Sequence, residues 1–165
     1  MQSYFSVFDL PESFNVDLSD LEKRYFSKQR EFHPDRLIGK TAAERQQSIS
    51  QSMLINTAYE ALKSPLKRAN HLLALNGLEP DKIKPSGALL MEIMELREEL
   101  ADADTIEKLE KIEACNTANK QHIITELATA FNTNKELASE LATKLSYLTK
   151  IDDEIRAKKS ILSKK

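Results

Sequence analysis

The sequence is poor in cysteine and glycine, and each scarcity excludes a class of protein. Cys115 is the single cysteine among 165 residues, so the chain can form neither an internal disulfide nor a zinc site built from several thiolates. The three glycines, Gly39, Gly77 and Gly87, cannot build a Walker loop or a dinucleotide-binding fingerprint. These absences indicate a reducing compartment and a protein that binds no nucleotide by those routes.

Neither a strong excess of charge nor a long apolar run is present. Lys and Arg total 24 and Asp and Glu total 26, a net charge of −2, which argues against nucleic-acid binding through bulk positive charge. No stretch approaches the roughly 18 consecutive apolar residues of a membrane span, so we expect no membrane partner. The first 17 residues lack the pattern of a signal or transit peptide. We therefore expect a location in the bacterial cytoplasm rather than in the mitochondrial matrix.

Apolar residues recur with helical spacing almost throughout, which predicts an all-α fold. In the first half we expect helices over about 3–8, 17–32, 41–62 and 64–76. Their starts carry capping signals, such as Thr41 followed three residues later by an acid. Gly77 is a natural stop for the fourth helix.

The segment 77–86 is predicted to be a linker, because prolines and a glycine cluster in and beside it. It separates an N-terminal domain, 1–76, from a C-terminal domain, 87–165. Three longer helices joined by short turns predict an antiparallel three-helix bundle in the second domain. These helices are expected over about 86–102, 104–131 and 133–161, with Asp104 and Thr133 as the capping residues of the last two.

The tripeptide His33-Pro34-Asp35 lies between two predicted antiparallel helices. Proline ends the preceding helix and stiffens the loop, which keeps the imidazole and the carboxylate exposed at a tip. The preceding helix carries four basic residues that lie away from its apolar stripe or at its edge, namely Lys23, Arg24, Lys28 and Arg30. A basic face beside a rigid tip suits docking on an acidic protein, although a helix terminator beside a solvated face would have the same pattern.

The helix predicted over 86–102 is more apolar than a bundle needs. Leu90, Met91 and Met94 fall outside its packing stripe and share a second face with Glu95, Glu98 and Asp102. An exposed apolar patch with a charged rim is typical of a partner site. A wide core stripe, in which the two methionines fill gaps, is the alternative.

These segments, taken in order, resemble a known family. A short helix with YFSVFDLP, a basic helix, HPD in the loop and a long helix with AY are similar to a J-domain. INTAYEALKSPLKRANHLL at 55–73 and LLMEIMELREEL at 89–100 resemble HscB proteins, which are co-chaperones of iron–sulfur cluster assembly. The resemblance implies a J-domain followed by a C-terminal three-helix bundle.

The resemblance also implies partners and roles. HscB proteins bring the scaffold protein IscU to HscA, a heat-shock-70-type chaperone whose ATPase they stimulate, so the chain would not itself be an enzyme. The chaperone-binding positions fall on His33, Pro34 and Asp35 and, less securely, on Arg24, Lys28 and Arg36. The scaffold-binding positions fall on Leu90, Met91, Met94, Glu95, Glu98, Asp102 and Tyr147. The CxxC pairs of some relatives are missing, so no metal and no cofactor is expected.

Two alternatives remain open from the sequence. The J-domain would be the same if the C-terminal bundle carried a different client protein. In a reading of another class, His33 and Asp35 would be the acid–base pair of a small hydrolase. Pro34 between them and the lack of a nearby nucleophile count against this reading.

Overall fold

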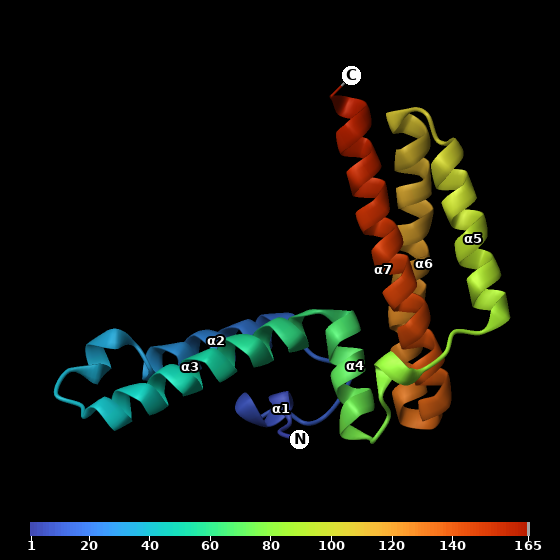
Figure 1. The fold of residues 1–165 in the computed structure, drawn as a ribbon. Coiled ribbons are helices and arrows are strands. Elements are labelled where there is room, and N and C mark those ends of the chain that lie inside the picture. The colour runs from blue at the N-terminus through green and yellow to red at the C-terminus, as the bar shows by residue number, and fades with distance from the viewer. Residues whose placement is uncertain (165) are drawn as a thin grey trace. The chain divides into compact units, whose positions relative to one another are not determined.

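The computed structural model describes residues 1–164, which fold into two compact units (Figure 1). The first unit runs from Met1 to Gly77, and the second begins at Leu78. All regular elements within residues 1–164 are helices, with no strand among them, which confirms the all-α prediction. The division between the units falls at the start of the segment predicted to be a linker.

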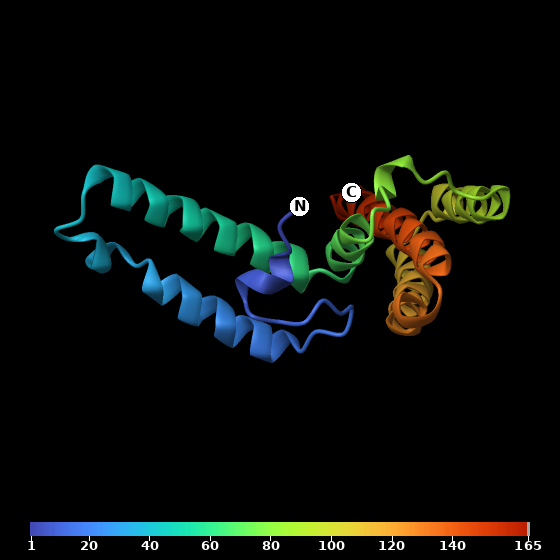
Figure 2. The ribbon, with the colours of Figure 1, turned by 90° about the horizontal axis from the view of Figure 1, so that it is seen from below.

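The first unit is built around a long helical hairpin. Its elements are α1 (Tyr4–Val7), α2 (Leu18–Glu31), η1 (Pro34–Leu37), α3 (Ala42–Lys63) and α4 (Pro65–Leu75). Helices α2 and α3 lie side by side and antiparallel in both views (Figures 1 and 2). The largest fully buried side chains of this unit are Phe5, Phe8, Leu21, Leu62 and Leu73.

Side-chain caps start the three longer helices of this unit, and the cap at Thr41 is the one that the sequence predicts. Asp17 accepts hydrogen bonds from the first turn of α2, Thr41 from the N–H of Glu44, and Ser64 from the first turn of α4. These bonds satisfy backbone donors that have no partner within the helix. Gly77 follows α4 with a φ of 80°, a left-handed conformation that glycine adopts without strain.

A buried arginine ties the end of α3 to the loop before α2. Arg68 is 6% exposed, donates from Nη1 to the carbonyl of Leu62 at 2.6 Å and lies 4.8 Å from the ring centroid of Phe14. Burial lowers the pKa of Arg68. The guanidinium thus satisfies one of the last carbonyls of α3 and covers an aromatic ring.

The second unit is an up-down-up bundle of three helices. It contains η2 (Pro80–Lys82), α5 (Gly87–Asp102), α6 (Ile106–Thr133) and α7 (Lys135–Ser163). The short η2, within the predicted linker, contacts α7. Helices α6 and α7 pack against each other over most of their length, and α5 runs beside them (Figure 1). The core contains Ile93 from α5, Leu109 and Leu127 from α6, and Leu145, Leu148, Ile151 and Ile155 from α7.

The start of α6 is one residue later than predicted. Thr105, not Asp104, is the capping residue, and its hydroxyl accepts from the N–H of Lys108 at 3.2 Å. The Asp104 carboxylate instead accepts from the ammonium of Lys108 at 2.7 Å. The ion pair with Lys108 lowers the pKa of the Asp104 carboxyl, so the aspartate contributes to the first turn as a charge while Thr105 caps it.

The start of α7 differs in the same way. Asn134, not Thr133, accepts from the N–H groups of Glu136 and Leu137 at 3.1 and 3.2 Å. Thr133 is the last residue of α6, and its hydroxyl donates to the carbonyl of Thr129 at 3.0 Å. Because Thr133 still belongs to α6, its side chain is not available to cap α7.

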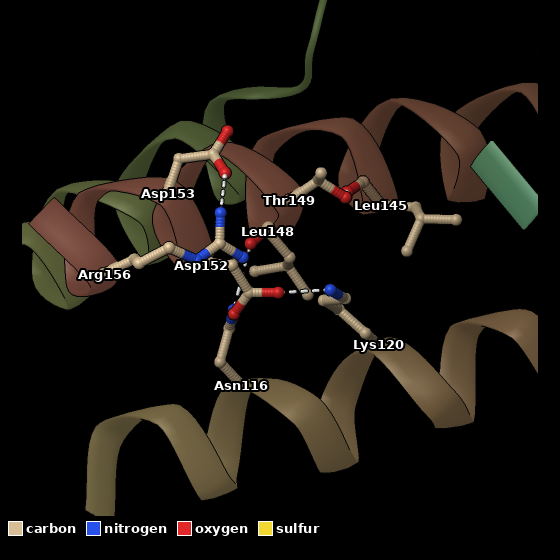
Figure 3. A network of polar contacts seen from close by, with 8 residues as sticks. All are labelled: Asn116, Lys120, Leu145, Leu148, Thr149, Asp152, Asp153 and Arg156. Carbon is tan, nitrogen blue, oxygen red and sulfur yellow. Dashed lines mark hydrogen bonds and ion pairs between the residues drawn. The ribbon is translucent and has the colours of Figure 1, made fainter. Parts of the chain in front are cut away.

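A polar network crosses the interface between α6 and α7 (Figure 3). Asn116 is 1% exposed and donates from Nδ2 to the carbonyl of Leu148 at 2.9 Å and to Asp152 at 2.6 Å. The other oxygen of Asp152 pairs with the ammonium of Lys120. A buried amide needs partners at fixed positions, so this network favours one register of α6 against α7.

His71 on α4 holds the first helix in place. Its Nε2 accepts from the backbone N–H of Tyr4 at 2.9 Å, and its ring stacks on that of Tyr4 with centroids 4.3 Å apart. Accepting this bond requires the neutral imidazole. Burial lowers the pKa of His71, an effect that the carboxylate of Glu12 partly opposes.

We predict that acid loosens α1 through His71. Its pKa in the folded chain lies below the unfolded value of about 6.5, so the unfolded chain takes up this proton first as the pH falls. The stabilisation is complete above about pH 6.5 and is lost progressively below it. Hydrogen exchange at the Tyr4 amide should accelerate between pH 7.5 and pH 5 beyond its intrinsic pH dependence, and His71→Phe should abolish that excess. The matched control is His122→Phe, at an exposed histidine of α6, which should keep the native acceleration. An equal excess acceleration of exchange in the native protein and in His71→Phe would refute the assignment.

Candidate functional site

The His33-Pro34-Asp35 turn is a capped, rigid tip. Helix α2 ends at Glu31, and Pro34 is the first residue of η1. The Nδ1 atom of His33 accepts from the backbone N–H of Asp35 at 3.2 Å. The side chains remain 58% exposed at His33 and 87% exposed at Asp35, so the turn presents an imidazole and a carboxylate to solvent.

This geometry gives no support to the hydrolase reading. In an acid–base pair the carboxylate accepts a hydrogen bond from an imidazole N–H. Here Nδ1 is itself an acceptor, which places the proton of the neutral ring on Nε2. The Asp35 carboxylate lies 3.5 Å from Nδ1, too far and with the wrong partner for such a bond.

Two of the predicted basic residues are engaged within the first unit. Arg24 donates from Nη1 to the carbonyl of Phe8 at 2.8 Å and from Nε to Asp20 at 2.9 Å. The ammonium of Lys28 lies 3.9 Å from the carboxylate of Asp9. Both side chains therefore hold the loop after α1 against α2, in addition to any role on the surface.

Three other basic residues are exposed and, in the part of the chain that the structure describes, are not neutralised by an ion pair. Lys23 and Arg30 on α2 and Arg36 in η1 are exposed, and within residues 1–164 none of the three forms an ion pair. Arg30 and Arg36 are close in the chain to the His33 turn. These two arginines stand beside the exposed acids Glu31 and Asp35, so this end of α2 presents charges of both signs to a partner.

An apolar groove beside the turn was not anticipated from the sequence. It has a volume of about 430 Å³, and His33 and Pro34 form part of its wall. Phe26 and Met53, which are 50% and 65% exposed, line it from α2 and α3. The available signal in the sequence was that Phe26 and Met53, both large and apolar, fall outside the packing stripes of these two facing helices. The turn is therefore continuous with a surface that can accept apolar side chains.

On α5, the apolar residues outside the packing stripe are exposed. Leu90, Met91 and Met94 are 42%, 61% and 60% exposed, which excludes the wide core stripe. Glu95, Glu98 and Asp102 on the same helix are also exposed. We call these six residues the α5 patch. It has the anatomy of a partner site, an apolar centre with an acidic rim.

Charged contacts from α7 fix the rotation of α5. Glu92 pairs with Lys144 at 3.2 Å, and Arg97 pairs with Glu154 at 3.1 Å. The ammonium of Lys158 donates to the carbonyl of Ala101 at 2.9 Å, in the last turn of α5. Arg97 is the only basic residue of α5, so its ion pair leaves the α5 patch without an unpaired positive charge from its own helix.

Tyr147, the predicted aromatic contact, lies on α7 and is half-buried. The ammonium of Lys150 lies 5.2 Å from its ring centroid, within the range of a cation–π interaction. This lysine over the ring was not predicted. Its i, i+3 spacing from Tyr147 on one helix was the signal for it.

Neither a metal-binding cluster nor a membrane-spanning helix is found in the part of the chain that the structure describes. Within residues 1–164, no three His, Cys, Asp or Glu side chains come together as a metal-binding group. None of the helices formed by these residues combines the length and the apolar character needed to cross a membrane.

The chain is similar to known co-chaperones over both units. Residues 86–156 match the family model described as the HSCB C-terminal oligomerisation domain. The chain is 37% identical to the iron–sulfur cluster co-chaperone protein HscB of Mus musculus, over 98% of this chain and 70% of the relative. It is 33% identical to the co-chaperone protein HscB of Proteus mirabilis, over 92% of each. The crystal structure of human co-chaperone protein HscB is 34% identical, with a TM-score of 0.89 over 96% of this chain and 83% of that one.

Exposure of the α5 patch predicts a contrast in stability. Met91→Ala and Met94→Ala should each change the free energy of unfolding by less than about 0.5 kcal/mol, because exposed side chains contribute little to the core. Ile93→Ala, at a site 2% exposed, should cost about 2–5 kcal/mol. Urea unfolding of the full chain measures both. A loss of unfolding free energy at Met91 or Met94 as large as that at Ile93 would show that these side chains belong to the core.

Proposed function

The chain belongs to the HscB family of iron–sulfur cluster co-chaperones, and on that premise we propose that its two surfaces bind two different proteins. The first unit, a J-domain, binds HscA, a heat-shock-70-type chaperone, and stimulates its ATPase through the His33 turn. The second unit binds the scaffold protein IscU at the α5 patch and Tyr147. The chain has no catalytic chemistry of its own in this proposal.

The exposed α5 patch is the observation that carries the proposal for the second unit. The bundle buries a complete stripe of α5 without Leu90, Met91 or Met94. Three large apolar side chains on one exposed face lose contact with water only if a partner covers them. The family resemblance assigns scaffold contacts to these same positions.

Charge favours a different protein over a second copy of this chain. In a two-fold symmetric dimer through the α5 patch, Glu95, Glu98 and Asp102 would face copies of themselves or of one another. Like charges brought together at an interface are unfavourable. A partner that presents basic residues around an apolar centre complements the patch.

For the first unit, the proposal rests on the rigid turn and the charge beside it. His33 and Asp35 are exposed, and the neutral His33 ring has its one N–H at Nε2. Arg30 and Arg36 add positive charge next to the turn, which suits an acidic chaperone surface. Carrying both sites in one chain raises the effective concentration of the scaffold at the chaperone.

His33→Gln should strongly reduce the stimulation of the chaperone's ATPase at a fixed concentration of the co-chaperone. Leaving the partner of a hydrogen bond unsatisfied at an interface costs about 1–3 kcal/mol, which is about five- to 150-fold in affinity. The measurement is ATP turnover by HscA with IscU, with and without the native protein or the variant. His122→Gln, an exposed histidine of the second unit, should stimulate as the native chain does. Stimulation by His33→Gln at the native level would exclude the turn.

Glu98→Lys should weaken binding of IscU by about tenfold or more at low salt, because it places a positive charge against a basic partner surface. Calorimetric titration of IscU measures this, with Glu110→Lys on α6 as the control for the same change in net charge. Stimulation of HscA in the absence of IscU should be unaffected. If native protein stimulates HscA but does not bind IscU, the α5 patch serves a different client.

A further inference from the structure

We propose that Lys150 is an affinity-limiting residue of the scaffold-binding surface, because it covers the ring of Tyr147 with a positive charge. The inference rests on the proposed function, because it takes Tyr147 and the α5 patch as the site of a basic partner. It assigns to Lys150 a role that opposes binding.

The ammonium of Lys150 lies over the ring of Tyr147. Lys150 is exposed on α7, and its Nζ lies 5.2 Å from the centroid of the Tyr147 ring. The π face attracts cations through its quadrupole, and a cation already over the ring occupies the position that a partner's lysine or arginine would take.

Lys150 differs from three other cations of the bundle, which have polar partners. Lys144 and Arg97 are each neutralised by a carboxylate, at 3.2 and 3.1 Å. Lys158 caps carbonyls at the end of α5. Within residues 1–164, Lys150 forms no ion pair, and its ammonium lies over the Tyr147 ring.

The positive charge of Lys150 opposes the binding of the basic partner that the acidic α5 patch favours. The acids Glu95, Glu98 and Asp102 select a basic partner. The same partner is repelled by Lys150, and it must displace the ammonium before its own groups reach Tyr147. An exposed cation–π contact contributes about 0.5–1 kcal/mol, so removing Lys150 should tighten binding by about two- to fivefold.

Lys150→Gln tests the proposal directly. We expect it to lower the dissociation constant for IscU by about two- to fivefold, measured calorimetrically with the full chain. Lys111→Gln, an exposed lysine of α6, makes the same change in net charge and should leave the dissociation constant unchanged. Lys150→Arg restores a cation over the ring and should bind as the native chain does. Unchanged or weaker binding by Lys150→Gln would overturn the proposal.

A double-mutant cycle shows whether Lys150 acts through the ring. Tyr147→Leu keeps an apolar side chain and removes the π face. In the Tyr147→Leu background, Lys150→Gln should increase the affinity for IscU by less than it does in the native background. An equal increase would show that Lys150 does not act through the ring. Native IscU binding that Glu98→Lys weakens establishes the site independently, so failure of Lys150→Gln is distinguishable from failure of the proposed function.

Discussion

The rotation of α5 about its own axis decides what the surface of the second unit can bind. Successive residues of a helix are separated by about 100°, so a turn of one residue would bury Leu90 and Met94 and expose Ile93. The apolar contacts of the buried stripe alone would allow small rotations of α5 about its own axis. The pairs formed by Glu92 and Arg97 with α7 are on either side of that stripe and oppose rotation in both directions. Each such exposed pair contributes little stability, but together they select one orientation, and the exposed methionines follow from it.

The first unit shows the same division between groups used for folding and groups left for a partner. Arg24 and Lys28 were candidates for the surface, yet both bind the loop after α1. Pro34 ends α2 and leaves a short tip where His33 caps its own turn. Near the tip, Arg30, Arg36 and the side chains of the turn are exposed, and neither arginine forms an ion pair within residues 1–164. Arg24 and Lys28 thus contribute to the fold, while these two arginines are available to a partner.

The sequence predicts local features better than the contacts between distant segments. Thr41 caps its helix as expected because a cap depends on four consecutive residues. Periodicity identifies the packing stripe of α5 but not whether the second apolar face is buried as well, since that depends on the packing against α7. Arg68 would be expected on the surface from its type, and only the packing of Phe14 and the end of α3 explains its burial. The cover of Lys150 on Tyr147 likewise requires side-chain positions.

The net charge of −2 conceals an uneven distribution of charge. The α5 patch is acidic, whereas the His33 turn carries both signs, from Arg30 and Arg36 and from Glu31 and Asp35. A basic surface would complement the α5 patch but not the turn in the same way. Charge that is nearly balanced overall also avoids the self-repulsion that the acidic patch would cause if it extended over the whole chain. The charge that a partner meets on the bundle thus depends on where acids and bases lie, and in our proposal Lys150, over the ring of Tyr147, lowers the affinity for a basic partner.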